Sequence, residues 1–165
     1  MSVVSIIGAG SWGTSLSVLL SNNGHQVRVW SRFQEEVDLL NREREHKEKL
    51  PGVKVPETVV FTSDLKACLE GHDFVVIVLP SQTVRENARL LAPYLSPNDI
   101  VVLCSKGIEE ESGKRLSQVV LEEAPGVRVV ALYGPSHAEE VAIGIPTTVV
   151  AACPDQDAAM KVQDL

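Results

Sequence analysis

Cysteine is scarce and scattered in this chain of 165 residues. Its three cysteines, Cys68, Cys104 and Cys153, form no C-x-x-C pair, and no histidine stands at ligand spacing from them. A disulfide framework and a zinc site are therefore not indicated, and we expect no bound metal. The three thiols are interpreted as buried or chemically inert.

Long apolar runs and basic clusters are also missing. The longest aliphatic run is Val75–Leu79, far short of the ~20 residues of a membrane-spanning helix, and the N-terminal MSVVSIIG lacks the basic head and cleavage site of a signal peptide. With 15 Lys and Arg against 22 Asp and Glu, the formal charge is −7, which suits nucleic acids poorly. We expect a cytoplasmic protein with no membrane insertion and no nucleic-acid partner.

Hydrophobic residues make up 44% of the chain and charged residues 22%, the proportions of an ordinary folded domain. The mean hydropathy is +0.07 and the pI about 5.1. A chain of this length buries roughly 70% of its unfolded surface, which is enough for a stable core without disulfide or metal cross-links. Disordered, fibrous and disulfide-scaffold classes are excluded, and residues 1–165 are taken as one domain.

Short runs rich in valine and isoleucine recur along the chain, each followed by a longer segment with apolar residues at helical spacing. This alternation is typical of βαβ units around a buried parallel sheet. It predicts an α/β fold with a doubly wound, mostly parallel sheet and helices on both faces. The predicted strands are Val3–Ile7, Gln26–Trp30, Val59–Thr62, Phe74–Leu79, Ile100–Leu103, Val127–Leu132 and Thr147–Ala152.

Helices are predicted between most of the strands. They are a stripe of Leu16, Leu19 and Leu20 that stops at Asn22-Asn23-Gly24, then Phe33–Arg44, a helix capped by Ser63, Ser81–Leu91, and Leu116–Glu123. The charged, proline-containing stretch Glu43–Pro56 is expected to be a surface connection. Asp155–Leu165 begins a further helix, and because neither a stop signal nor another strand follows, we expect a cut inside or just beyond a domain.

A glycine-rich turn, Gly8–Gly13 (GAGSWG), follows the first predicted strand and opens the first predicted helix. In this G-x-G-x-x-G pattern Gly8 makes the tight turn, Gly10 lets the backbone approach a pyrophosphate, and Gly13 lets helix and strand pack closely. The free amides of the helix then face the phosphates. The context favours a dinucleotide-binding Rossmann-type domain over an ordinary glycine-rich turn, and no Gly-Lys-Ser/Thr follows to indicate a P-loop.

The second predicted strand ends at Trp30 and is followed by Ser31 and Arg32, where an NAD enzyme usually has an acid that binds the ribose 2′-hydroxyl. A guanidinium beside a hydroxyl suits a 2′-phosphate instead, which favours NADP(H) over NAD(H). Glu35 and Glu36 follow closely and can point back, so NAD(H) stays open. Arg32 as a solvated cation at a helix start is a third interpretation.

Two loops that follow the fourth and fifth strands are expected at the same edge, because ligands of a doubly wound sheet bind outside the carboxyl ends of its strands. Pro80–Thr83 either shapes the wall of the crevice or starts a helix with Ser81 as its cap. Lys106, followed by Gly107, is expected to hold a substrate oxygen or phosphate and to attract the anionic dinucleotide. An exposed lysine without a ligand is the alternative.

The loop after the sixth strand contains Gly134 and Ser136, which offer a tight turn and a hydroxyl at a helix start. We expect an anion or carbonyl site here, with simple capping by Ser136 as the alternative. His137 suits proton transfer, but no carboxylate partner is identifiable, so a general-base role is not favoured. No Ser-His-Asp or Cys-His set is apparent, which disfavours hydrolase chemistry. The other histidines are expected at the surface: His25, His46 and His72.

Three segments together resemble a known family. GAGSWGTSL after the first strand, SKGIE after the fifth and GPSHAEEVA after the sixth, in this order and spacing, resemble the N-terminal domain of bacterial NAD(P)-dependent glycerol-3-phosphate dehydrogenase. LPG at Leu50–Gly52 and LPS at Leu79–Ser81 fit as well. The resemblance covers nearly the whole chain and is far more specific than the glycine pattern alone.

The resemblance implies roles for individual residues. The expected cofactor contacts, which include the three glycines of the turn, are Gly8, Gly10, Ser11, Trp12, Gly13, Arg32, Lys106 and Ala138. The expected contacts with glycerol phosphate are Lys106, Gly134 and Ser136. His137 matches a position where the family accepts other side chains.

The implied reaction of the intact enzyme is reversible hydride transfer between sn-glycerol 3-phosphate and dihydroxyacetone phosphate with NAD(P)(H), in service of phospholipid synthesis. The family's proton-acceptor lysine and phosphate-gripping residues lie in a helical second domain, which these 165 residues do not match. This chain is therefore expected to be the cofactor half, inactive alone, and a homodimer of the intact enzyme stays open. Two alternatives are a non-catalytic dinucleotide-sensing regulatory domain and the N-terminal domain of a related hydroxy-acid dehydrogenase.

Overall fold

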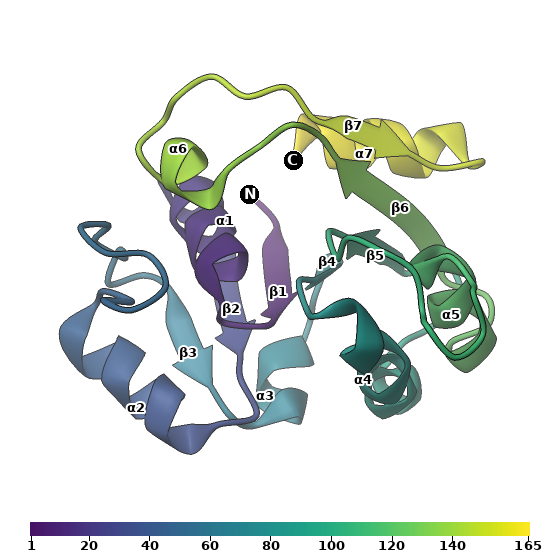
Figure 1. The fold of residues 1–165 in the computed structure, drawn as a ribbon, viewed down its shortest axis with the longest axis horizontal. Helices are drawn as coiled ribbons and strands as arrows, with labels where there is room; N and C mark the ends of the chain where they lie inside the picture. The colour runs from purple at the N-terminus through teal and green to yellow at the C-terminus, as the bar shows by residue number, and fades with distance from the viewer.

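A seven-stranded sheet runs through the centre of the computed structural model, which describes all of residues 1–165 (Figure 1). The strand order is β3-β2-β1-β4-β5-β6-β7, and all neighbours are parallel except β6 and β7, which pair antiparallel at one edge. The strands are β1 (Val3–Ile7), β2 (Gln26–Trp30), β3 (Val60–Thr62), β4 (Phe74–Ile77), β5 (Ile100–Leu103), β6 (Arg128–Tyr133) and β7 (Val150–Ala152). The predicted doubly wound, mostly parallel sheet is confirmed.

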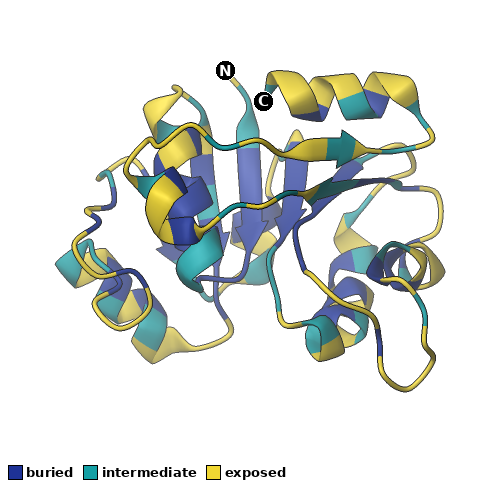
Figure 2. Ribbon diagram, turned by 45° about the horizontal axis from the view of Figure 1, so that its top comes forward, coloured by how far each residue is buried: buried dark blue, intermediate teal, exposed yellow.

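Helices cover both faces of the sheet, as the alternating pattern predicts. α1, α2, α6 and α7 pack on one face, and α3, α4 and α5 pack on the other (Figure 1). Their bounds are α1 (Ser11–Asn22), α2 (Gln34–Glu43), α3 (Leu65–Leu69), α4 (Val84–Leu91), α5 (Leu116–Glu123), α6 (Ala138–Ala142) and α7 (Gln156–Asp164), with 3-10 turns η1 (Ser81–Thr83) and η2 (Ala92–Tyr94). Figure 2 shows the central strands buried between these two layers. None of the helices has the length and apolar character that crossing a bilayer requires.

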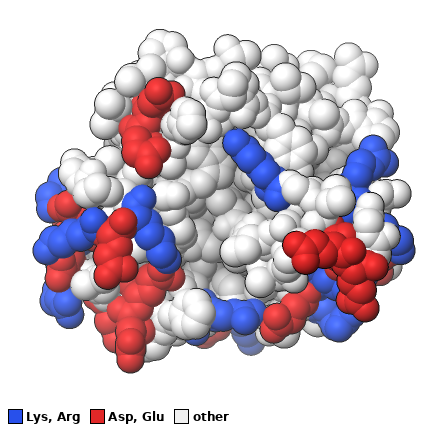
Figure 3. Space-filling model, in the orientation of Figure 1, with Lys and Arg blue, Asp and Glu red and all other residues white.

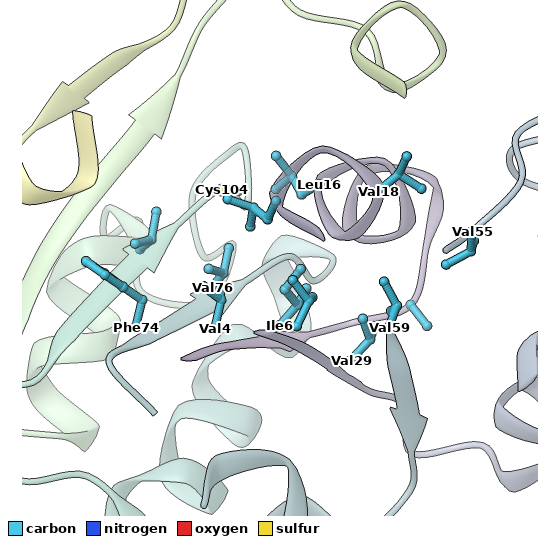
Figure 4. Packing of buried hydrophobic residues seen from close by; sticks show 14 of the residues in the cluster. Val4, Ile6, Leu16, Val18, Val29, Val55, Val59, Phe74, Val76 and Cys104 are labelled. Carbon is cyan, nitrogen blue, oxygen red and sulfur yellow. The ribbon is translucent and has the colours of Figure 1, made fainter. Parts of the chain in front are cut away.

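The strands divide their side chains between two apolar clusters, one on each face of the sheet. On β1, Val4 and Ile6 belong to the cluster on the α1 side, whereas Ile7 belongs to the cluster on the α4 side. Figure 4 shows Ile6 and Val76 of the sheet lying across from Leu16 of α1. Because alternate residues of a strand share a face, a slip of one residue would move each side chain to the opposite face and disrupt the packing of both clusters. The buried runs thus set the register of the strands that carry the site.

The segment between α2 and β3 is not the plain surface connection that its charges and prolines indicate. Leu50, Val53 and Val55 are buried in the cluster on the α1 side. His46 is also buried, with 3% of its surface exposed, so its expected place at the surface is wrong. The apolar side chains of this segment attach it to the core, but their spacing has neither helical nor strand periodicity. Because sequence prediction depends on such periodicity, the burial of this segment could not be predicted.

Two predicted details of the elements also change. α3 is capped by Asp64, whose carboxylate accepts a hydrogen bond from Ala67 N (3.1 Å), and not by Ser63. β7 begins at Val150 and not at Thr147. Both Ser63 and Asp64 are acceptable capping residues, so the sequence alone does not decide between neighbours of this kind.

The topology reverses beside β1, which lies between β2 and β4. The connections that leave β1 and β4 run in opposite directions from this point, and the crevice between them lies outside the carboxyl ends of the strands. The glycine-rich turn and the loops after β4, β5 and β6 all open at this edge. The fold therefore brings together segments that are up to about 130 residues apart in the chain, since the turn starts at Gly8 and the last loop contains Ser136.

Candidate functional site

The turn between β1 and α1 leaves no room for side chains at two of its glycines. Gly8 has φ +119°, and a Cβ added there would lie 2.3 Å from the carbonyl oxygen of Val78. A Cβ added to Gly13 would lie 2.0 Å from the carbonyl oxygen of Gly8. Gly8 therefore permits the turn and its approach to β4, and Gly13 permits α1 to start directly against the turn.

Gly10 differs from both neighbours, because a Cβ added there meets no atom of the chain within 4 Å. Gly10 is the N-cap residue of α1; no side chain caps the helix, and its first turn contains no acidic residue. The amides of Ser11 and Trp12 begin the helix beside this open space. An uncapped helix N-terminus with room in front of its backbone is suited to a phosphate or pyrophosphate.

The loops after β4 and β5 and the last residue of β6 meet at Ser105, for which the sequence predicts no role. Leu79 N donates to Ser105 Oγ and Tyr133 OH donates to Ser105 O, both at 2.9 Å. The first bond replaces a strand partner, so β4 ends at Ile77 and not at Leu79 as predicted. The predicted convergence of these loops at one edge is confirmed. The available signal for Ser105 is its place beside Lys106, directly after a buried strand.

Lys106 lies at this junction without an ionic partner. Its side chain is exposed, and no carboxylate lies within 4.0 Å of its ammonium group. Gly107 follows with φ +107°, and a Cβ added there would lie 3.5 Å from the side chain of Ser81. On the face shown in Figure 3 most charges gather at the two flanks, over α2 and over the α4–α5 region, and the hollow between them is mostly uncharged, with one basic side chain at its upper edge. An unpaired cation in such a place is available to an anionic ligand.

A salt-bridge network holds the loop that carries Lys106. Arg85 of α4 donates to both carboxylate oxygens of Glu109, at 2.7 and 2.8 Å. The same guanidinium donates to Glu122 and Glu123 of α5. Hydrogen bonds from Arg85, and then from the nearby serine hydroxyl of the loop, lower the pKa of Glu109 to about 2. The charged form of Glu109 is thus strongly favoured in the folded protein.

The loop after β6 is held over α1. Ser15 Oγ donates to the carbonyl oxygen of Ala138 (2.8 Å), and Ala138 is buried with 8% of its surface exposed. A Cβ added to Gly134 would lie 2.4 Å from Thr148 O, so this glycine is required by the passing chain before β7. α6 has His137 as its N-cap residue, and capping by Ser136 is therefore wrong.

Ser31 and Arg32, which were expected to bind a 2′-phosphate together, are held in different environments. Ser31 is buried, and its hydroxyl donates to Glu36 Oε2 (2.5 Å). Arg32 instead contacts α4, where its Nη2 lies 3.2 Å from Glu86 Oε1 and 3.4 Å from Asn87 Oδ1. Because the Ser31 hydroxyl is already engaged, the joint site is not supported, and Arg32 is the partly exposed cation at this end of the crevice.

Glu36 is occupied by partners within the chain. Its carboxylate accepts from Ser31 Oγ and from Lys49 Nζ (2.7 Å), and lies 3.3 Å from His46 Nε2. Burial by itself would raise the pKa of Glu36, but the hydrogen bonds from Lys49 and Ser31 hold this pKa below its ordinary value. Of the two acids left open as partners for the ribose, Glu36 is therefore engaged elsewhere, whereas Glu35 is exposed in the first turn of α2 and stays open for that role.

The cysteine beside the site is inert in this fold. Cys104 directly follows β5 and is buried, and burial raises the pKa of its thiol to about 12. The same cause raises the pKa of the Cys68 thiol to about 12. Both remain protonated near neutral pH, so neither is a ready nucleophile or metal ligand. Cys153 is partly exposed.

An apolar groove of about 950 Å³ lies next to the site, between α1, the segment before β7, and α7. Trp12 at the start of α1 and Val76 and Val102 of the sheet line it. It does not reach Lys106, and its lining is mostly hydrophobic. Its chemistry is therefore unsuited to a phosphate, and the anion-binding features are confined to the carboxyl edge of the strands.

The parallel sheet, the reversal beside β1 and the uncapped helix after a G-x-G-x-x-G turn define a Rossmann-type domain. Residues 3–159 match the family described as NAD-dependent glycerol-3-phosphate dehydrogenase N-terminus. The chain belongs to this family, and the resemblance drawn from its three sequence segments is confirmed.

Individual relatives agree with the family match. The glycerol-3-phosphate dehydrogenase (NAD(P)+) of Agathobacter rectalis is 47% identical over 165 residues, which are 100% of this chain and 49% of the relative. The protein of the same name from Moorella thermoacetica is 48% identical over 162 residues, 98% of this chain and 48% of the relative. A crystal structure of glycerol-3-phosphate dehydrogenase from Coxiella burnetii superposes with a TM-score of 0.93 at 34% identity, covering 99% of this chain and 50% of that one. The chain spans about half the length of these relatives.

Proposed function

We propose that this chain is the cofactor-binding domain of a glycerol-3-phosphate dehydrogenase and that it binds NADPH or NADH at the carboxyl edge of its sheet. The observation that carries the proposal is the contrast among the glycines of the turn. The space that a side chain would need at Gly8 and Gly13 is occupied by backbone atoms of the chain. At Gly10 this space is free, and it lies in front of an uncapped helix. That geometry fits a pyrophosphate and serves no packing purpose.

The residues around the crevice fit the remainder of a dinucleotide. Ser11, Trp12 and Gly13 supply the first helical turn, Arg32 lies at the adenosine end, and Lys106 lies across the crevice beside β5. Ala138 presents its backbone from α6, although its side chain is buried against α1. The cofactor supplies the hydride when it is bound; the protein contributes orientation and charge.

The proposed substrate pair is sn-glycerol 3-phosphate and dihydroxyacetone phosphate, the substrate class implied by the names of the relatives. Lys106 is the residue we assign to the reacting oxygen, which its ammonium group orients and polarises. Gly134 and Ser136 lie in the loop after β6 and offer backbone groups and a hydroxyl to the same ligand. The main role of Gly134 in the fold is to make room for Thr148, so its contact with substrate would be through backbone atoms.

Residues 1–165 form the cofactor half in this proposal, and a second domain supplies the proton acceptor. The chain matches about half of each relative, which is consistent with that division. A dinucleotide sensor without catalysis is one alternative. Lys106 argues against it, since a sensor needs no unpaired cation beside the nicotinamide end. The third interpretation, a hydroxy-acid dehydrogenase, is not favoured by the family match.

The direct test is a fluorescence titration of the chain with NADPH and NADH, combined with chemical modification of Lys106. We expect saturable binding of both cofactors, and protection of Lys106 from an amine-reactive reagent when NADPH is present. Lys114 lies elsewhere in the same loop and is paired with Glu122 of α5; it is the internal control and should show no cofactor-dependent change. Equal modification of Lys106 with and without saturating NADPH would remove it from the site.

A further inference from the structure

A salt bridge joins the two sides of the crevice at its adenosine end. Arg32 Nη2 lies 3.2 Å from Glu86 Oε1, and the side chains are 40% and 62% exposed. Arg32 follows β2, whereas Glu86 lies in the first turn of α4, after β4. Since β1 lies between β2 and β4 in the sheet, the pair spans the end of β1 from which the glycine-rich turn begins. An anion that binds Arg32 must therefore compete with Glu86.

Two other charged groups near this point, Lys49 and Glu36, are already paired with each other. Lys49 donates to Glu36, which also accepts from the buried Ser31. Arg32 is consequently the cation best placed for an additional phosphate. Its second acceptor is the amide oxygen of Asn87 at 3.4 Å.

Asn87 holds the guanidinium without adding charge. Its side chain is buried, with 2% of its surface exposed, and its own Nδ2 donates to Thr83 O (2.7 Å). The amide oxygen is therefore fixed in place, and it stays within reach of Arg32 when Glu86 is changed. Without the charge of Glu86, an anion would no longer compete with a carboxylate for Arg32, and the guanidinium would still be held by Asn87.

We propose that Glu86 is a specificity-determining residue that sets the preference between NADPH and NADH, an inference that rests on the proposed function. Glu86 competes with the 2′-phosphate of NADPH for the guanidinium of Arg32. The 2′-hydroxyl of NADH carries no charge, so the salt bridge persists when NADH binds. Glu86 thereby weakens NADPH binding selectively and brings the two affinities closer together, which a lone arginine would not do.

The test compares Glu86→Gln, Arg32→Ala and the double variant by fluorescence titration with NADPH and NADH. Gln keeps the size and an amide oxygen, so the charge is the main change. We expect Glu86→Gln to tighten NADPH binding about fivefold, the upper range for an exposed pair, and to change NADH binding by less than about twofold. In the Arg32→Ala background the same substitution should change NADPH binding by less than about twofold, because the two residues act as one unit.

Glu111→Gln is the matched charge control, since Glu111 is an exposed acid in the loop after β5 and forms no salt bridge. It should leave the ratio of the two affinities unchanged. An equal change for both cofactors in Glu86→Gln, or an undiminished effect in the Arg32→Ala background, overturns the inference while the proposed function stands. Failure of the unsubstituted, folded chain to bind either cofactor overturns both.

Discussion

Single residues show how one sequence motif combines a folding requirement with a binding requirement. Gly13 and Gly8 are needed because backbone atoms approach within 2.0 and 2.3 Å of the position of a Cβ, whereas nothing in the chain approaches Gly10. Gly10 also has φ −69°, which any residue adopts without strain. The three glycines are indistinguishable in the sequence pattern, but their substitutions are expected to have different consequences.

Gly13→Ala should destabilise the fold, and Gly10→Ala should impair binding without doing so. The added methyl group at position 13 meets the carbonyl oxygen of Gly8, and such overpacking costs about 1–3 kcal/mol of the free energy of unfolding. At position 10 the loss of stability should stay below about 1 kcal/mol, whereas NADPH affinity should fall by roughly tenfold or more because the methyl group occupies the space before the helix. Urea unfolding and NADPH titration measure the two effects. Wild-type affinity in Gly10→Ala would place the pyrophosphate elsewhere.

The limits of sequence reasoning are also visible at single residues. The pairing of Ser31 with Arg32 was a reasonable expectation from adjacency, but the Ser31 hydroxyl is engaged by Glu36, five positions along the chain. Ser105 joins its own loop to the loop after β4 and to the end of β6 through its hydroxyl and its carbonyl group, yet a serine after a strand has no distinguishing pattern. Such partners depend on tertiary distances, which residue types alone do not specify.

At the level of elements, the buried strands were the easiest to predict. β1, β2 and β5 have the predicted bounds, because their consecutive valines and isoleucines are buried on both faces of a parallel sheet. β7 was predicted three residues too long, since Thr147 and the residues after it run past Gly134 before pairing begins. The burial of the segment around Leu50 was not predicted, because its few buried apolar residues are irregularly spaced among many charged ones.

Glu109→Gln should lower the melting temperature of the domain at neutral pH and make the remaining stability less sensitive to acid. Glu109 in the loop is bound to Arg85 of α4, which lowers its pKa from 4.5 to about 2. A lowered pKa in the folded state contributes stability above the ordinary value, and this contribution is lost as the pH falls from about 4.5 toward 2. The difference in melting temperature between the wild type and Glu109→Gln is therefore expected to be largest at pH 7 and to shrink below pH 4.5.

Two further glutamates separate this effect from loss of charge in general. Glu111→Gln removes an exposed acid of the same loop that forms no salt bridge, and it should leave the melting temperature unchanged. Glu123→Gln removes a partner of the same arginine from α5 and should destabilise the domain without releasing the Lys106 loop. Calorimetric scans at several pH values provide the comparison. A constant gap between the wild type and Glu109→Gln from pH 7 to pH 3 would contradict the assignment.

The molecule as a whole determines what the site can do by itself. The carboxyl edge of the sheet gathers a helix N-terminus, Arg32 and the unpaired Lys106 along one crevice, and the proposed cofactor binding rests on this arrangement. The order of loops around that crevice could be predicted from the alternation of strands and helices, because the doubly wound topology leaves little choice. The pairing of Arg32 with Glu86 could not, since it joins helices and loops that are 54 residues apart.

This chain should bind NADPH without reducing dihydroxyacetone phosphate at a measurable rate. Hydride transfer to a carbonyl also requires a proton for its oxygen and a closed site that fixes the substrate. Here Lys106 is exposed, the Ser105 hydroxyl accepts from Leu79 N, and Ser136 offers a single hydroxyl. One cation and one hydroxyl on an open edge orient a small phosphorylated ligand poorly. Most of the rate acceleration that comes from holding the reactants close together and aligned is therefore lost.

The absorbance of the reduced nicotinamide follows the reaction, and the fluorescence titration on the same sample shows whether cofactor is bound. We expect no oxidation above the rate of a protein-free control, with cofactor sites saturated. Lys106→Ala serves as the second control, because any oxidation that survives it comes from a contaminant. Oxidation that depends on dihydroxyacetone phosphate and disappears in Lys106→Ala would mean that the cofactor domain contains its own proton donor, and Lys106 itself would then be the group best placed to provide it.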